Sequence, residues 1–167
     1  MYQKTLENPR NHLVSAQRFS FEGEYEHKLD KKLRVSVPSS WRPSAGGSFG
    51  LRLLKWELSG IPVIKALTDE AFTAALESIQ NSDLPAGVKS RQKAALHTHN
   101  QPVSVNEQGK LLIPKKFAEE RGLQGDGAIH FLGRGNYFEI VTPTNYEALY
   151  ANEQDILGTL YDTLDFG

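Results

Sequence analysis

Four cations surround a single acid near the start of the sequence, an arrangement that could bind phosphate. The acid is Asp30, and the cations are Lys28, Lys31, Lys32 and Arg34. Four positive charges and one negative charge give this segment a local charge of +3, although the formal net charge of the chain is −1. Lysine and arginine pair with phosphate oxygens, so the cluster indicates nucleic-acid binding. A solvated hairpin tip would show the same residues, and composition alone leaves both interpretations open.

The spacing within the cluster gives its members different roles. A carboxylate at the start of a turn can accept hydrogen bonds from the amides of the turn, so Asp30 is expected to orient Arg34 rather than to touch DNA. A second, weaker group of cations lies at Lys110, Lys115 and Lys116. Arg34 and Lys110 each begin a strand on its outward face, and both should point into solvent.

The segment that carries the cluster occurs twice. Residues 29–38 return 76 positions later as residues 105–114, with the residue classes in the same order: apolar, Asx, three turn residues, a cation, an alternating strand and a proline. Asn106 corresponds to Asp30, Gly109 to Leu33, and Lys110 to Arg34. The chain is therefore predicted to hold two diverged copies of one unit.

Each copy is predicted to fold as two strands, a short helix, two more strands and a long helix. Alternation over residues 24–29 and 34–37 predicts paired strands, with Tyr25, His27 and Leu29 on one face. Residues 103–105 and 111–113 are their counterparts. Pro38 and Pro114 end the strands and open short helices, the second of which runs from about 114 to 121 before Gly122, whereas Pro43 cuts the first one short.

The second half of each copy follows the same logic. Residues 49–56 and 63–67 in the first copy, and 128–132 and 137–141 in the second, predict a further hairpin. Thr68 and Thr142 are predicted helix N-caps, and a further helix from about 85 to 96 joins the copies.

These elements predict five segments. They are an N-terminal arm (1–20) that composition favours as disordered, a first unit (21–80), a linking helix (81–101), a second unit (102–150) and a C-terminal helical tail (151–167). Each unit is small, so the copies are expected to share a core or to assemble into an oligomer. The absence of cysteine, and an N-terminal stretch without an apolar run, favour an intracellular protein with no membrane partner.

Other candidate sites are weaker. His97 and His99 would share a strand face, but no further ligand lies nearby at metal-binding spacing, so we predict no metal and no cofactor. Residues 133–136 (Gly-Arg-Gly-Asn) precede a strand, where a phosphate cradle would need a helix. Ser39-Ser40 and Asp69-Glu70 are interpreted as helix starts, so neither catalysis nor a small-molecule substrate is expected.

The last helix carries an apolar stripe whose partner the sequence leaves open. The stripe consists of Tyr146, Leu149, Tyr150, Ile156, Leu157, Leu160, Tyr161 and Leu164. Helical spacing of this kind is typical of a packing face rather than of a base-stacking surface. A neighbouring subunit and the chain's own core are both possible partners.

Taken in order, these motifs resemble the MraZ proteins. Residues 21–30, followed by Arg34 and Pro38, look like the opening of that family, whose two AbrB-like units each carry a D-x-x-x-R hairpin. Residues 135–140 are similar to the G-N-x-F-E-I strand of its second unit. The resemblance spans about residues 21–150.

The resemblance implies a fold and a function. The fold would be α+β: an AbrB-like double-split β-barrel of two pseudo-symmetric copies with added helices. The function would be that of a bacterial transcriptional regulator, mainly a repressor of the division and cell-wall gene cluster, in the cytoplasm and nucleoid. Such proteins form ring-shaped homo-oligomers that bind short direct repeats in double-stranded promoter DNA.

This sequence departs from the family pattern at one position in the first turn and at two positions in the second. The first copy has Leu33 where the family has glycine, and the second has Asn106 and Lys110 where the family has the acid and arginine. If that turn needs a positive φ, a leucine there costs about 1–2 kcal/mol, unless the turn differs. We therefore expect the first hairpin to matter more for DNA. A ring-forming scaffold with weak or lost DNA binding is the alternative, and an antitoxin-like AbrB protein is a more distant one.

Overall fold

The structure of the chain, a computed structural model, describes residues 19–164. Its elements in chain order are β1 (Glu24–Lys28), β2 (Arg34–Ser36), the 3₁₀ helix η1 (Ser39–Trp41), β3 (Phe49–Leu58), β4 (Ile61–Leu67), α2 (Asp69–Gln80), α3 (Ala86–His99), β5 (Gln101–Val105), β6 (Lys110–Leu112), α4 (Lys115–Arg121), β7 (Ala128–Gly133), β8 (Tyr137–Val141) and α5 (Pro143–Thr163). The predicted arm lies outside the described residues except at its last two positions. There Phe19 stacks on Phe21 with ring centroids 5.3 Å apart.

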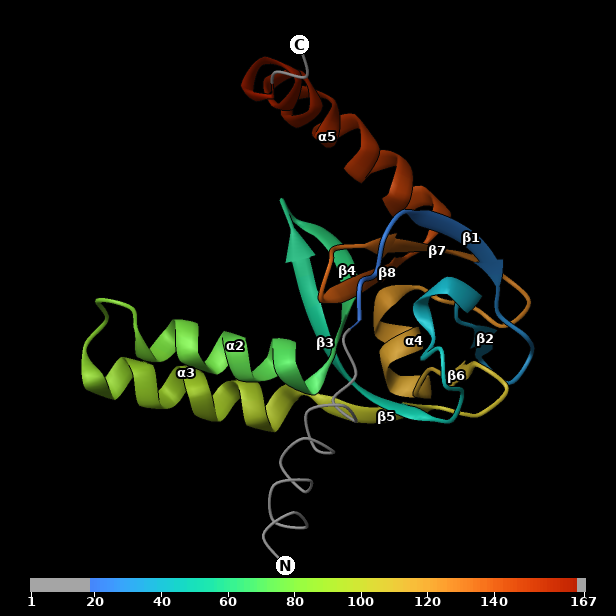
Figure 1. The fold of residues 1–167 in the computed structure, drawn as a ribbon, viewed down its shortest axis with the longest axis horizontal. Coiled ribbons are helices and arrows are strands. Elements are labelled where there is room, and N and C mark those ends of the chain that lie inside the picture. Colours follow the sequence, from blue (N-terminus) through green and yellow to red (C-terminus); the bar gives the residue numbers. More distant parts are fainter. Residues whose placement is uncertain (1–18, 165–167) are drawn as a thin grey trace, which may run out of the picture.

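The described strands form one antiparallel sheet of eight, in the order β1-β7-β8-β4-β3-β5-β6-β2. The first and last strands of that order, β1 and β2, are consecutive in the chain, so the sheet curls into a nearly closed barrel (Figure 1). Both copies contribute strands to this one barrel. The prediction of an α+β, AbrB-like double-split barrel with added helices is confirmed.

The predicted pairing of residues 24–29 with 34–37 is wrong. β1 pairs along its whole length with β7, and β2 pairs with β6. This exchange between copies gives every strand a partner, and the hydrogen bond between the His27 ring and the Ser36 carbonyl bridges β1 and β2 instead. Of the residues expected to face inward, Leu29 is buried and His27 is half-buried, whereas Tyr25 is 37% exposed.

A pseudo-twofold axis relates the two copies and passes through two strand pairs. Val35 lies opposite its counterpart Leu111 between β2 and β6. Lys65 lies opposite Glu139 between β4 and β8, and these residues are counterparts because the helix caps Thr68 and Thr142 follow them at equal distance. Outward from the β4–β8 pair, the order β4-β3-β5-β6 matches the order β8-β7-β1-β2 strand for strand, so each half of the barrel contains two strands of either copy.

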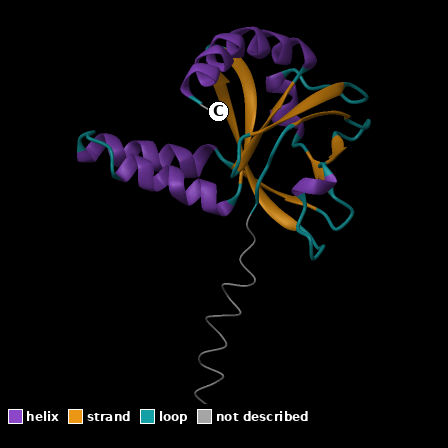
Figure 2. Cartoon of the chain, turned by 45° about the horizontal axis from the view of Figure 1, so that its top comes forward, coloured by secondary structure: helices purple, strands orange, loops and turns teal. Residues whose placement is uncertain are grey.

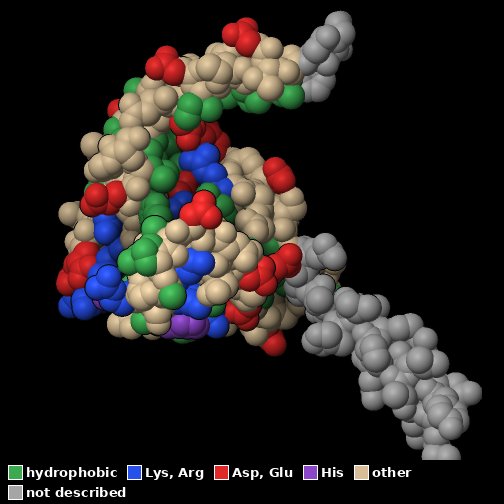
Figure 3. Space-filling model, turned by 90° about the vertical axis from the view of Figure 1, so that its left-hand side faces the viewer, with side chains coloured by type: hydrophobic (Ala, Val, Ile, Leu, Met, Phe, Trp, Pro, Cys, Tyr) green, Lys and Arg blue, Asp and Glu red, His purple; other side chains and the backbone are tan. Residues whose placement is uncertain are grey.

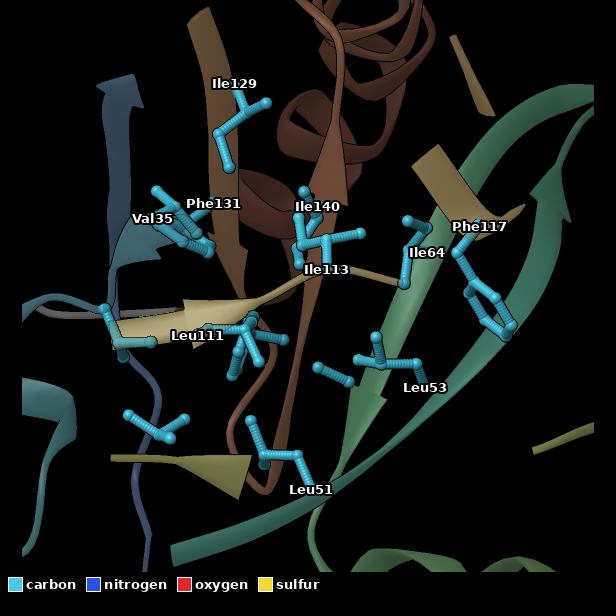
Figure 4. Close-up of a cluster of buried hydrophobic side chains, with 14 of the residues drawn as sticks. Val35, Leu51, Leu53, Ile64, Leu111, Ile113, Phe117, Ile129, Phe131 and Ile140 are labelled. Carbon is cyan, nitrogen blue, oxygen red and sulfur yellow. The ribbon is translucent and has the colours of Figure 1, made fainter. Parts of the chain in front are cut away.

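The barrel interior is filled by apolar side chains from both copies. Val35, Leu111 and Ile113 meet Ile64 and Ile140 in its centre (Figure 4). Trp41 and Phe117, which follow the two prolines by three residues, are 2% and 6% exposed. Burial of one such side chain stabilises the fold by about 1.5–3 kcal/mol, so neither copy keeps its share of the core alone.

Helices α2 and α3 form a hairpin that projects from the barrel (Figures 1 and 2). The Thr68 side chain accepts a hydrogen bond from the Ala71 amide and caps α2, as predicted. The linking helix is longer than predicted, because α3 runs to His99. His97 and His99 therefore lie on a helix and not on a strand. Within residues 19–164 no group of three or more His, Cys, Asp or Glu residues could hold a metal ion.

Helix α5 begins against the barrel and then leaves it. Thr142 caps it, and the Tyr146 ring stacks on His130 at 4.0 Å while its hydroxyl donates to Glu24 at 2.8 Å. That hydrogen bond is the main reason why the pKa of Tyr146 rises to about 12. Leu149 is buried and Leu157 is half-buried, whereas the other later apolar side chains of the stripe are exposed: Tyr150, Ile156, Leu160, Tyr161 and Leu164. No helix within the described part of the chain combines the length and apolar character needed to cross a membrane.

Candidate nucleic-acid interface

The first turn is built around the carboxylate of Asp30. Its Oδ1 accepts hydrogen bonds from the amides of Lys32 at 2.8 Å and Arg34 at 2.9 Å, and its Oδ2 accepts from Arg34 Nε at 2.8 Å. The Arg34 amide is the main cause that holds the pKa of Asp30 below its usual value. The Arg34 guanidinium and the Lys32 amide act in the same direction, and desolvation opposes them. The ionised carboxylate thus fixes the pose of a guanidinium that is 50% exposed.

The second turn reproduces this backbone geometry with a neutral side chain. Asn106 Oδ1 accepts hydrogen bonds from the amides of Gln108 at 3.0 Å and Lys110 at 2.9 Å. A carboxamide has only one oxygen, so Asn106 cannot also hold a cation through a second oxygen. The Lys110 ammonium instead donates to Ser36 Oγ across the barrel seam at 2.6 Å. The two turns therefore share a backbone and differ in what holds their cation.

The fourth residue of each turn has a left-handed backbone. Leu33 has φ 64° and Gly109 has φ 80°. Their amides close the turns by donating to the carbonyls of Asp30 at 3.1 Å and Asn106 at 2.8 Å. The first turn thus keeps the left-handed conformation of the second at the Cβ cost of about 1–2 kcal/mol. The Leu33 side chain packs against the main core, which offsets part of this cost.

Arg34 and Lys110 lie on the same outer face of the barrel. β2 and β6 are antiparallel neighbours in which Arg34 lies opposite Leu112 and Ser36 lies opposite Lys110 (Figure 1, right). The two cations are diagonal neighbours, so the two residues are about 7–8 Å apart and their Cβ atoms are somewhat closer. The middle residues of both strands point into the core, which leaves this pair of cations at either end of a short outward ribbon.

Further cations surround the ribbon. Lys28, Lys31 and Lys32 are exposed beside the first turn, and Lys115 and Lys116 are exposed at the start of α4. Lys115 Nζ approaches Glu119 at 3.8 Å, an exposed i,i+4 contact of little energetic weight. Within residues 19–164, Lys28, Lys31, Lys32 and Lys116 are in no salt bridge. The structure therefore leaves these charges exposed, with Lys31, Lys32 and Lys115 around one hollow.

Sequence reasoning missed one cation at this surface. Arg42 follows η1 in the first copy, yet its guanidinium lies on the second turn and donates from Nη1 to the Gln108 carbonyl at 3.3 Å. A Cβ on Gly109 would occupy the space of that guanidinium. Alignment of the two copies could have drawn attention to Arg42, because its counterpart after Phe117 is Ala118.

The glycine-rich turn at residues 133–136 has a structural role. Arg134 Nε donates to Glu139 at 2.7 Å and its Nη2 donates to Glu153 at 2.9 Å. Glu139 is 1% exposed and also accepts from Lys65 at 2.8 Å. A strand follows this turn, and its arginine is already paired with two carboxylates, so the turn offers no phosphate site.

The chain is similar to curated bacterial proteins over most of its length. A transcriptional regulator MraZ of Ruegeria pomeroyi is 31% identical over 143 residues, which cover 76% of this chain and 80% of that protein. The transcriptional regulator MraZ of Lachnoclostridium phytofermentans is 30% identical over 149 residues, covering 88% and 97%. That of Ruegeria sp. (strain TM1040) is 29% identical over 160 residues, covering 87% and 91%. No protein-family model matches the chain.

Proposed function

The chain belongs to the MraZ family of transcriptional regulators, and from that premise we propose that it represses transcription by binding direct repeats in promoter DNA as a ring of identical subunits. The relatives are named as transcriptional regulators and not as enzymes, which agrees with a DNA-binding regulator. The cytoplasm, at the nucleoid, is the proposed location. The genes under control are proposed to be those of cell division and wall synthesis, which the family resemblance implies.

The observation that supports this function most is the outward ribbon of β2 and β6. It presents Arg34 and Lys110 as diagonal neighbours on one outward face, on a chain whose net charge is −1. The lysines that flank the ribbon extend its positive charge, so DNA would approach through the ribbon and these lysines. Lys28, Lys31 and Lys32 are the proposed flanking contacts, and Asp30, Asn106 and Gly109 shape the turns without touching DNA.

One ribbon neutralises few phosphates, so useful affinity requires several ribbons at fixed spacing. Counterion release scales with the number of phosphates contacted, and linking binding sites raises the effective concentration of the later ones. A ring supplies both. The exposed second half of the α5 stripe supports this assembly, because such apolar side chains on a projecting helix are typical of a protein interface.

The first experiment measures binding to DNA. We expect Arg34→Glu to abolish binding of a direct-repeat duplex from the region upstream of the protein's own gene, measured by fluorescence anisotropy at 100 mM salt. Light scattering should show that this variant keeps the subunit number of the wild type, because Arg34 faces outward. If the wild type ignores this duplex even at low salt but still assembles, the scaffold alternative is correct.

The second experiment tests the assembly. Ile156→Glu places a charge in the exposed stripe and should reduce the molar mass seen by light scattering. Ala151→Glu is the matched control, since Ala151 is exposed on the opposite side of the same helix. Equal masses for both variants and the wild type would remove α5 from the proposed subunit interface.

A further inference from the structure

The second turn carries Lys110 where the first turn has Arg34, but another arginine contacts it. Arg42 belongs to the first copy, five residues after the end of the Arg34–Val37 segment that leads away from the first turn, and it reaches across the seam. The segment that leads from Val37 to Arg42 is anchored at its start, because the Val37 amide donates to the Gly109 carbonyl at 2.9 Å. The indole of Trp41 is buried and donates to the Glu22 carbonyl at 2.9 Å. Arg42 is therefore held over the second turn by two anchored residues that precede it in the chain, Val37 and Trp41.

The guanidinium of Arg42 has unused hydrogen-bonding capacity. It carries five N–H donors, and within residues 19–164 it makes one hydrogen bond, to the Gln108 carbonyl at 3.3 Å. Its Nε is buried and finds no acceptor there. No carboxylate of the described residues forms a salt bridge with it. Because its guanidinium is charged and has donors without acceptors, binding of an anion to Arg42 would lower the free energy of the protein.

The first turn shows the opposite arrangement. Ala118, the counterpart of Arg42, is uncharged and buried. Together with Leu33 it lines an open hollow of about 640 Å³ beside Lys31 and Lys32. Where Arg42 lies in the second half, the first half has open space, and the arginine of the first half, Arg34, stands on its own turn. Each turn thus has one arginine at its surface. Arg34 belongs to the first turn itself, whereas Arg42 reaches the second turn from the other copy.

We propose that Arg42 is the DNA-contacting arginine of the second turn, supplied by the first copy, because the cation of the second turn itself is Lys110. This inference rests on the proposed DNA-binding function and extends it to a residue outside both hairpins. The ligand of Arg42 is a backbone phosphate of the bound duplex. The glycine at position 109 is then a packing requirement, because any Cβ there would displace the guanidinium.

The test compares neutral substitutions at two arginines in the full-length chain. Arg42→Gln should weaken binding of the direct-repeat duplex about fivefold or more and should lower the slope of log affinity against log salt by about one per contacting subunit. Arg91→Gln removes the same charge from the exposed surface of α3, which projects away from the barrel that carries both turns (Figure 1), and should leave affinity and slope unchanged. Arg42→Lys should keep the salt slope while losing part of the affinity, because an ammonium keeps the charge but not the planar fork.

The outcomes separate this inference from the function on which it rests. If Arg34→Gln weakens binding while Arg42→Gln binds as tightly and with the same salt slope as Arg91→Gln, then Arg42 does not contact DNA and the proposed function stands. If the wild type does not bind the duplex, both proposals fall. Thermal unfolding followed by circular dichroism accompanies each variant. A fall in affinity of Arg42→Lys without any change of slope in Arg42→Gln would assign Arg42 a structural role only and overturn the proposal.

Discussion

The two turns at the barrel seam have the same backbone and different side chains. Asp30 and Asn106 each accept two amides of their turn through one oxygen, and Leu33 and Gly109 each adopt a positive φ. The comparison shows which features the turn requires: an acceptor at the first position and a left-handed residue at the fourth. The side chain of the cation that follows can vary, because that residue closes the turn through its backbone amide.

The same comparison holds at the opposite side of the barrel, on the pseudo-twofold axis. A residue on such an axis faces its own counterpart, so two identical charged residues would repel each other inside the protein. Here the counterparts are Lys65 and Glu139, whose side chains are 13% and 1% exposed and lie 2.8 Å apart. Divergence of the copies within one chain has allowed opposite charges to meet at this position.

The largest predicted effect comes from placing two like charges on the pseudo-twofold axis. Glu139→Lys should lower the free energy of unfolding by about 3–5 kcal/mol, because it removes the buried partner of Lys65 and places a second cation there. Urea denaturation at fixed protein concentration measures the change. The double exchange with Lys65→Glu should recover part of the loss, although Arg134 then faces a cation. An unchanged denaturation midpoint for the single variant would contradict this account of the axis.

The second prediction makes the second turn resemble the first at its left-handed position. Gly109→Ala should lower the free energy of unfolding by about 2 kcal/mol, because an alanine at positive φ is strained and its Cβ displaces the Arg42 side chain. Leu33→Gly is the reciprocal variant. It relieves a similar strain but removes a partly buried side chain and loosens the unfolded chain, so its net change should stay within about 1 kcal/mol. Comparable losses for both variants would mean that the turns tolerate a Cβ equally.

The third prediction exchanges the cations of the two turns. Arg34→Lys should weaken binding of the direct-repeat duplex about fivefold, because the Asp30 carboxylate no longer fixes a planar fork toward DNA. Lys110→Arg should strengthen binding by about threefold at most, since Asn106 offers no second oxygen to hold the new side chain. Anisotropy titrations at one salt concentration decide the order, and equal effects of the two exchanges would show that the acid has no orienting role.

The fourth prediction uses pH to open one turn and not the other. Because hydrogen bonds lower the pKa of Asp30 in the folded protein, its contribution to stability is present at neutral pH and is lost as pH falls through that lowered pKa, below 3.8. Amide hydrogen exchange at Lys32 and Arg34 should therefore accelerate in this range relative to Gln108 and Lys110, because Asn106 does not titrate. Asp30→Asn should abolish the difference, and equal acid sensitivity in both turns of the wild type would count against it.

The sequence by itself determined the repeat, the order of strands and helices, and the residues of the two turns. These features are local: alternation sets strand faces, Thr68 and Thr142 cap helices through their own first turns, and a proline removes one ladder donor wherever it stands. Tertiary structure decided which strands pair, so β1 and β2 of one predicted hairpin found their partners in the other copy. It also placed Arg42 on the second turn and Lys65 beside Glu139. Such contacts join residues 66 and 74 positions apart, and no local pattern encodes them because their energy arises only when both copies close around one core.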